Sequence, residues 1–471
     1  MRMPLRLALF LIPLAGWAHA QVPPTPSTAQ DPAGEDPLLL ALIQQALAGN
    51  PDLGQAKALV DADKERIPQA AALADPTLTL GIQNDGFDRI KVGEMETSFY
   101  QVMLTQPLPW PGKRGKRGEV ARLGAEATEI AVARTRLTVE ADVRRAYTGL
   151  LLVRSQLRLL EQQALFLEQA EATARTQYEV GKGRQSDLLR AQLERTRLNQ
   201  ARARLQADER NAQYQINRLR SAAPGEPIAT QRSLEQLPDP QPAGPDFPAK
   251  AASESPELRS AKLGLQQAQS TLDLARLDRR PDFSVSFGVM PRGVLEPMWT
   301  ASVGISLPLW QKSKQKRAVA EQEYRQSASG FAAEQVRCLL EQRIQERNSD
   351  LESSLQVIRL YRDGLLIQSE ATFRATLSQY TVGQLPFLSV LEALNGWVAD
   401  QSGLLQAQAQ AQATRIAQLE LTLGPTPGIG GSALAAGGMG ASPGAGSGSA
   451  KAGAAKAGAP EGSSSSSSGG M

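Results

Sequence analysis

The sequence predicts an α+β protein in which long antiparallel coiled-coil helices build an α-barrel and each chain adds four transmembrane β-strands. Three observations lead to this prediction. Residues 113–178 and 312–379 contain no proline, and each stretch is long enough for a helix of about 100 Å. A pair of segments with alternating apolar and polar residues precedes each stretch, and the whole arrangement occurs twice along the chain.

The first element is a predicted secretory signal peptide, residues 1–20. Two arginines precede an apolar run from Leu7 to Trp17, and Ala18-His19-Ala20 is a small-x-small cleavage site. A short membrane anchor is the alternative interpretation, although the run is too short to span a bilayer. Residues 21–35 are expected to form a linker. No later segment is apolar enough for a transmembrane helix, so we expect strands to enter the membrane.

An internal duplication divides most of the remaining chain into two repeats, residues 36–235 and 248–424. The landmarks that recur at an offset of 200 to 205 residues are Asn50-Pro51-Asp52-Leu53 with Ser255-Pro256-Glu257-Leu258, Pro107-Leu108 with Pro308-Leu309, and Gln177-Tyr178-Glu179-Val180-Gly181 with Gln379-Tyr380-Thr381-Val382-Gly383. A period this long is no solenoid repeat, so each copy is expected to be one unit. The tail, 425–471, is almost wholly Gly, Ala, Ser and Pro and is predicted to be disordered, with partner binding as the alternative.

The helices are predicted from heptad spacing. The apolar residues that follow an unbroken 4-3-4-3 pattern in the first long stretch are Val139, Val143, Ala146, Leu150, Val153, Leu157, Leu160, Ala164 and Leu167. In the second, Leu351, Leu355, Ile358 and Leu365 keep this pattern only in part. Further helices are expected over 186–221 and 249–280. These two half-length helices could stack end to end beside each long one.

The alternating segments predict strands with one apolar and one small, polar face. Their apolar residues are Leu78, Leu80, Ile82, Tyr100, Val102 and Leu104 in the first copy, and Phe283, Val285, Phe287, Val289, Trp299, Val303 and Ile305 in the second. Such strands suit a transmembrane β-barrel, and a half-buried sheet in a soluble domain is the alternative. Four strands cannot close a barrel, two chains give eight strands with a filled interior, and three give twelve with a passage. We therefore expect a homotrimer.

Composition excludes several classes of function. The formal net charge is only +3, which gives no reason to expect nucleic-acid binding. With one His, His19, and one Cys, Cys338, the sequence excludes a disulfide within one chain, a zinc or copper site built on several His and Cys ligands, and the base of Ser-His-Asp catalysis. We expect no enzyme and no cofactor.

These residues resemble the outer membrane factors of bacterial tripartite efflux systems, the TolC family. The resemblance covers residues 36–424 and rests on the duplicated unit, the Asn-Pro-Asp-Leu opening, the Pro-Leu-Pro-Trp-Pro-Gly-Lys-Arg strand exit at 107–114 and the Tyr-x-Val-Gly turns. The strand exit is most similar to the CzcC- and CusC-like branch that serves heavy-metal pumps. The resemblance implies a TolC-like channel-tunnel, with a trimeric 12-stranded barrel in the cell outer membrane and a helical barrel in the periplasm. A periplasmic adaptor and an inner-membrane pump of the RND type would load it with metal ions or drugs.

The resemblance also assigns roles to the two turns. Adaptor docking is implied at Tyr178, Val180, Gly181, Val382 and Gly383. A glycine here also ends a helix in the left-handed conformation, and both roles are compatible.

A periplasmic gate is implied just beyond the second turn. Family members carry acids at the positions of Ser389 and Glu392, so only Glu392 keeps its carboxylate, and three would ring a trimer axis and attract cations. An ordinary solvated glutamate is the alternative. Asp187 and Tyr380 match positions that lock neighbouring helices, but Leu385 replaces the partnering Arg.

The basic clusters at 113–117 and 312–317 are expected either to meet anionic headgroups of outer membrane lipid or to be solvated faces. Cys338 is expected to be a small core residue.

The alternative function is an exported coiled-coil scaffold without a pore, which accounts for the heptads but not for the strands. An enzyme with paired carboxylates would need a cleft that no motif marks.

Overall fold

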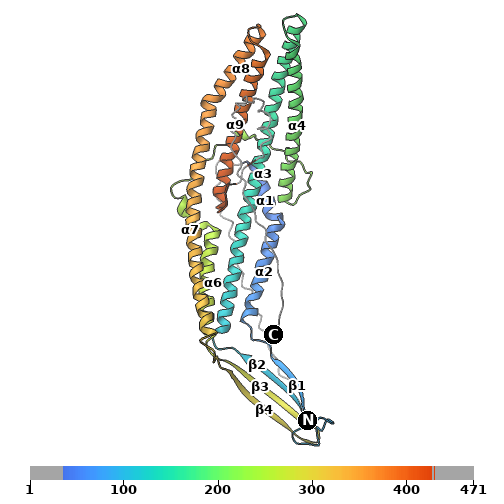
Figure 1. Ribbon diagram of the computed structural model, residues 1–471, viewed down its shortest axis with the longest axis vertical. Coiled ribbons are helices and arrows are strands. Elements are labelled where there is room, and N and C mark those ends of the chain that lie inside the picture. The colour runs from blue at the N-terminus through green and yellow to red at the C-terminus, as the bar shows by residue number, and fades with distance from the viewer. Residues whose placement is uncertain (1–35, 427–428, 430–471) are drawn as a thin grey trace, which may run out of the picture. The chain divides into compact units, whose positions relative to one another are not determined.

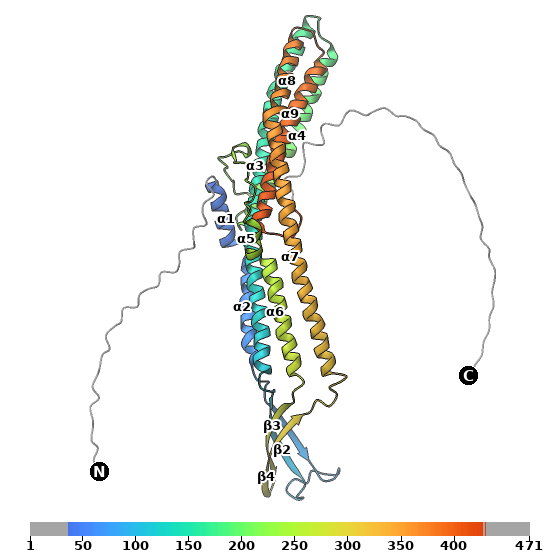
Figure 2. The same cartoon turned by 90° about the vertical axis from the view of Figure 1, so that its left-hand side faces the viewer.

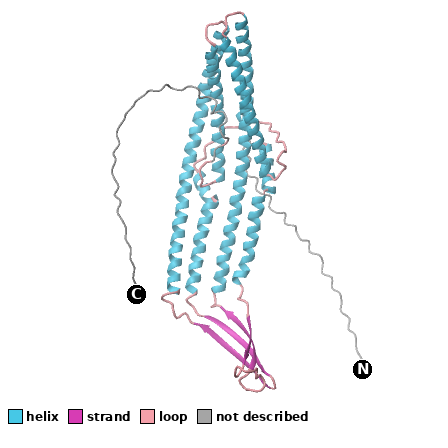
Figure 3. Ribbon diagram, turned by 45° about the vertical axis from the view of Figure 1, so that its right-hand side comes forward, coloured by secondary structure: helices cyan, strands magenta, loops and turns pink. Residues whose placement is uncertain are grey.

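The computed structural model describes residues 36–426 and residue 429. The predicted signal peptide, the linker and all but three residues of the predicted tail lie outside the described residues. The described residues belong to one unit of the chain, in which helices lie side by side and a four-stranded sheet is attached at one end (Figures 1 and 3). None of the described helices is long and apolar enough to cross a membrane.

Helix, hairpin, long helix and helix follow one another twice along the chain. The first half comprises α1 (Pro37–Gly49), α2 (Pro51–Ala71), β1 (Thr77–Gln83), β2 (Phe99–Leu108), α3 (Lys113–Glu179) and α4 (Gln185–Leu219). A connector that contains the short 3-10 helix η1 (Leu234–Gln236) leads to the second half. This half comprises α5 (Phe247–Glu254), α6 (Pro256–Leu277), β3 (Asp282–Arg292), β4 (Leu295–Ser306), α7 (Gln315–Leu360), the π-helix η2 (Tyr361–Leu365), α8 (Leu366–Thr381) and α9 (Phe387–Glu420).

The four strands form one antiparallel sheet in the order β1-β2-β3-β4, with β1 and β4 at its edges. Cross-strand rows on the apolar face are Leu78–Leu104–Phe287–Ala301 and Leu80–Val102–Val289–Trp299. The opposite face carries small polar rows such as Thr77–Thr105–Ser286–Ser302. The hydroxyl oxygens of Thr105 and Ser286 lie 2.9 Å apart. The predicted α+β class, with four strands of alternating character, is confirmed.

Helix α3 is the element against which most of the other helices pack. Helices α2 and α6 lie along its half nearest the sheet, and α4 and α9 lie along the other half (Figures 1 and 2). The nine apolar residues of the predicted 4-3-4-3 pattern, from Val139 to Leu167, form the seam of α3. Seven of them are buried, and Leu157 and Ala164 are partly buried. The predicted seam is therefore confirmed. Because α3 has neighbours on several sides, residues outside the seam such as Leu151 and Leu159 are buried as well.

Half-length helices do stack end to end, but in different pairs from those predicted. Asn50 caps the start of α2 by accepting from the Asp52 N–H at 2.9 Å, and its Nδ2 donates to the Leu219 carbonyl at the end of α4 at 3.0 Å. In the second half Ser255 caps α6 by accepting from the Leu258 N–H at 3.3 Å. Helix α2 thus continues α4, and α6 continues α9, instead of 186–221 continuing 249–280.

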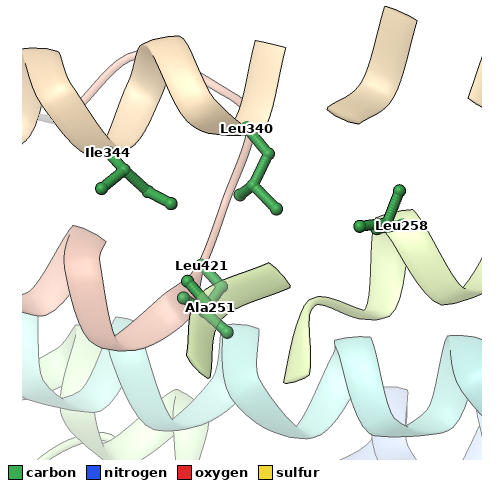
Figure 4. Packing of buried hydrophobic residues seen from close by; sticks show 5 residues of the cluster. All are labelled: Ala251, Leu258, Leu340, Ile344 and Leu421. Carbon is green, nitrogen blue, oxygen red and sulfur yellow. The ribbon is translucent and has the colours of Figure 1, made fainter. Parts of the chain in front are cut away.

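An apolar cluster marks the junction of α6 with the end of α9 (Figure 4). Its buried members are Ala251, Leu258, Leu340, Ile344 and Leu421. Beside it, the buried guanidinium of Arg347 donates to the carbonyls of Ala417, Thr422 and Gly424 at 3.0, 2.6 and 2.9 Å. Leu421 has a left-handed backbone, with φ of +54°. Arg347 and the cluster therefore hold the point at which the chain leaves α9.

The second long helix differs from the predicted uninterrupted helix over 312–379. It begins at Gln315, and the π-helix η2 separates α7 from α8. A π-turn contains one residue more than an α-turn, which rotates the apolar face that follows. Leu351 and Ile358 are buried as predicted, but Leu365 is 43% exposed and Leu366 packs in its place.

Two further expectations are wrong. The predicted helix 249–280 is split, because Ser255 leaves the helical conformation before Pro256 and a proline cannot continue a hydrogen-bonded helix. Cys338 is exposed and is no core residue. The helix α7 buries Leu340 and Ile344, so a residue two positions before Leu340 lies on a different face.

Candidate functional site

The candidate site consists of the two helix-to-helix turns at the end of the helices away from the sheet (Figure 1). One turn joins α3 to α4 through residues 180–184, and the other joins α8 to α9 through residues 382–386. In both, the sequence Tyr-x-Val-Gly spans the end of the preceding helix and the start of the turn.

The two turns have the same backbone geometry. In the first, the Lys182 N–H donates to the Gln177 carbonyl at 2.8 Å, and the Gly181 N–H donates to the Tyr178 carbonyl at 3.0 Å. In the second, Gln384 donates to Gln379 and Gly383 donates to Tyr380, both at 2.9 Å. These pairs define a Schellman motif, which requires a left-handed residue. Gly181 and Gly383 supply it, with φ of +73° and +79°.

Each turn presents a valine to the outside. Val180 is 63% exposed and Val382 is 69% exposed, and the ring of Tyr178 is also exposed. Apart from the glycine and its two chain neighbours, no described residue has an atom within 4 Å of the position that a Cβ would take on Gly181 or Gly383. The backbone of each turn is thus satisfied internally, while an apolar side chain and an uncovered glycine remain available to a partner.

The side chain of Gln177 connects the first turn to the second. Its Nε2 donates to the Tyr380 carbonyl at 3.0 Å. The Tyr380 ring packs on the buried Phe387 at the start of α9, with centroids 5.5 Å apart. Sequence reasoning missed this role of Gln177, although its recurrence as Gln379 was an available signal.

The structure separates the four predicted gate residues into two pairs. Asp187 lies in the first turn of α4, where the helix dipole favours an acid, and its charge acts on the buried Tyr380. Ser389 and Glu392 lie in the first two turns of α9, where Ser389 is half-buried and Glu392 is exposed. Within the described residues, no three His, Cys, Asp or Glu side chains could jointly hold a metal ion.

Tyr380 gives a titration prediction for this end of the molecule. Burial, reinforced by the negative charge of Asp187, raises the pKa of Tyr380 to about 12. An unperturbed tyrosine has a pKa near 10, so the folded state retains the proton longer, and stability is lost as the pH rises through 10 to 12. Subtracting the ultraviolet titration of Tyr380→Phe from that of the wild type should leave one tyrosine that ionises near pH 12. Tyr324→Phe, at an exposed site, is the control, and a Tyr380 difference centred near pH 10 would contradict the burial.

Three aromatic rings fix the helices that carry the turns. Phe166 on α3 meets Phe373 on α8 and Trp397 on α9 at centroid distances of 5.2 and 5.6 Å, and the last two stack at 6.2 Å. Such contacts add to simple area burial. No spacing rule predicts this cluster, because its members come from three helices and both repeats. It holds α3 against the α8–α9 hairpin and so holds the two turns beside each other.

A comparison of the sequence with protein families decides the assignment. Residues 42–224 and 247–424, most of the chain, match the family described as outer membrane efflux protein. The chain belongs to this family. It is thus an outer membrane efflux protein, and the two turns lie at one end of its helices.

Solved structures of outer membrane channels share the fold of this efflux protein. The open-state MtrE channel of Neisseria gonorrhoeae has a TM-score of 0.67 at 19% identity, covering 82% of this chain and 89% of that one. VceC of Vibrio cholerae has a TM-score of 0.67 at 15% identity, covering 81% and 95%. CusC has a TM-score of 0.65 at 20% identity, covering 82% and 92%. The channel-tunnel fold predicted for the chain is confirmed. No curated protein sequence matches the chain.

Proposed function

We propose that this efflux protein is the trimeric outer membrane channel of a tripartite, RND-type efflux system. The observation that carries the proposal is the open sheet: β1 and β4 are edge strands, and their apolar side chains are exposed. Open edges are not tolerated in lipid, so the sheet must pair with sheets of other copies. Three copies supply twelve strands, enough to surround a passage lined by the small polar face.

In this proposal the helices form an α-barrel in the periplasm, and the turns form its free end. A periplasmic adaptor docks on Val180 and Val382 beside their glycines, and an inner-membrane pump delivers the cargo. Support comes from the position of the turns opposite the sheet and from their exposed valines. The cargo is a metal ion or a drug that passes through without chemical change. The strand-exit motif at 109–114 favours the heavy-metal branch.

The gate in this proposal is a ring of three Glu392 carboxylates. Its support is that Glu392 is exposed near the start of α9, beside the second turn. Tyr380 and Asp187 contribute to closure by holding the α8 and α4 ends together. Because Leu385 offers no cation to Asp187 and Ser389 offers no second carboxylate, closure depends mainly on helix packing.

Single-channel recording tests both the channel and the gate. Protein extracted from outer membranes should run as a detergent-dependent trimer and conduct in planar bilayers with a preference for cations. Glu392→Gln should keep the conductance but lose most of the cation preference, or the block by divalent cations, at the periplasmic mouth. Glu65→Gln, at an exposed position on α2, is the matched control.

The results distinguish the channel from the coiled-coil scaffold, and the Glu392 gate from an ordinary exposed glutamate. A wild-type protein that is extracted by salt without detergent and does not conduct would favour the coiled-coil scaffold. Conducting trimers whose selectivity is unchanged by Glu392→Gln would retain the channel and remove the gate assignment.

A further inference from the structure

An apolar row runs along the edge strand β4 and continues beyond its end. Val303, Ile305 and Leu307 are exposed at alternate positions, and Leu309 continues the alternation. Leu309 and the adjacent Trp310 are 77% and 76% exposed. The chain then changes from apolar to cationic before and at the start of α7. The exposed cations there are Lys312, Lys314, Lys316 and Arg317.

These four cations have no side-chain partner in the part of the chain that the structure describes. Among the described residues, the structure gives none of them an ion pair or a side-chain hydrogen bond. The first turn of α7 also contains no acidic residue and no side-chain cap. Local positive charge at the start of a helix adds to the positive end of the helix dipole. The region is therefore electrostatically unbalanced in the isolated chain.

The corresponding cluster of the first half is used within the fold. Lys113 is buried, and its Nζ lies 2.9 Å from Asp282 and 3.4 Å from Asp278. Arg114 donates to the Ala71 carbonyl at 2.8 Å, and Lys116 pairs with Glu119 at 2.9 Å. The ring of Trp110 stacks on Phe283 at 5.7 Å, with the Arg280 guanidinium 5.8 Å from its centroid. The same motif is thus structural in one repeat and unpartnered in the other.

We propose that the junction patch, formed by Leu307, Leu309, Trp310, Lys312, Lys314, Lys316 and Arg317, binds the headgroup region of anionic phospholipid. This inference rests on the proposed position of the sheet in the outer membrane. Leu307 and Leu309 contact the acyl chains nearest the surface, Trp310 lies at the interface, and the cations contact phosphate groups. Tryptophan and long cationic side chains favour this depth of a bilayer.

Charge and continuity favour lipid over another protein as the occupant. The patch extends the apolar row of β4, so a bilayer that covers the strand also covers Leu309. Four like charges that no acid pairs with among the described residues are unsuited to the core of a protein interface, where lysine is depleted. Near an anionic leaflet, by contrast, each cation strengthens association by roughly fivefold.

Lipid retention by the intact trimer tests the proposal. Purified protein is incubated with mixed micelles that contain equal phosphatidylglycerol and phosphatidylcholine, and the retained lipids are counted by native mass spectrometry. The wild type should retain phosphatidylglycerol preferentially. Replacing the four cations by glutamine should reduce this preference by about tenfold or more, because all four act together. Replacing the three lysines by arginine should preserve it.

A matched control removes four exposed cations elsewhere, Lys57, Arg66, Arg136 and Arg204, and should leave the preference unchanged. Two results would overturn the proposal: an unchanged preference in the glutamine variant, or loss of the trimer in that variant alone, which would assign the cations to a neighbouring copy. Conductance distinguishes failure of the lipid-binding proposal from failure of the proposed channel function. If glutamine-variant trimers still conduct, the channel function is retained whatever the lipid preference.

Fluorescence provides a test that leaves every cation in place. With Trp110, Trp299 and Trp397 replaced by phenylalanine, and the predicted signal peptide removed on export, Trp310 is the remaining tryptophan. In vesicles its emission should be quenched more strongly by phosphatidylglycerol brominated at carbons 6 and 7 than at carbons 11 and 12. Absence of quenching by both lipids would place Trp310 away from the bilayer and refute the proposal.

Discussion

Replacing Gly181 and Gly383 together by glutamate should abolish efflux while assembled protein remains in the outer membrane. Both glycines have left-handed backbones and open space where a side chain would project. The substitution therefore costs about 1–2 kcal/mol per residue in backbone energy, and its Cβ meets no atom of another described residue outside the turn. A bulky charge beside Val180 and Val382 would instead block the surface that we assign to the adaptor. Efflux is measured as growth under drug or metal challenge, and assembly as the detergent-stable trimer.

Two controls separate docking from strain in this experiment. Asparagine tolerates the left-handed conformation, so Gly181→Asn with Gly383→Asn should keep most of the efflux. Gly330→Glu adds the same charge to α7, again in open space. Efflux that survives the double glutamate variant would refute docking at the turns. Loss of efflux in the asparagine variant would assign the effect to the backbone.

The largest effect on stability is expected at Arg347. Arg347 is 3% exposed, its guanidinium donates to three carbonyls at the end of α9, and burial lowers its pKa. Arg347→Met leaves these carbonyls without their donor, at a cost of about 1–3 kcal/mol for each buried group that water does not reach. Amide hydrogens near the end of α9 should therefore exchange roughly a hundredfold faster.

Arg359→Met is the matched control for this measurement. Arg359 lies on the same helix, α7, and is exposed. Its replacement should leave exchange near the end of α9 unchanged. If Arg347→Met leaves this exchange unchanged as well, the end of α9 is held by the apolar cluster around Leu421 and Ile344 instead of by Arg347.

Periodic features of this fold could be predicted from the sequence. The seam from Val139 to Leu167 and the strand alternation depend on spacings of 3.5 and 2 residues, which burial enforces directly. The turns could be located because Val180-Gly181 and Val382-Gly383 each end a long helical pattern, and glycine supplies the left-handed residue there. Each of these signals is local in the chain.

Contacts between distant segments could not be predicted in the same way. Lys113 belongs to a charge run that resembles a solvated face, and its burial depends on Asp278 and Asp282 from the other repeat. Gln177 acts on Tyr380 across some 200 residues. In both cases the partner is set by the packing of the two repeats, which neither heptads nor motifs encode.

At the π-helix Tyr361–Leu365, the long helix can lose one residue without a change in the packing of the helix that follows. Elsewhere in α3 or α7, adding or removing a residue would rotate everything beyond it by about 100° and divide the packed seam. A π-turn already holds one extra residue, so its loss would restore an ordinary α-turn without rotating α8. Leu366 would still follow Ile358 in the packed row, and the second turn would still meet Gln177. A one-residue deletion here should therefore leave the position of the two turns unchanged.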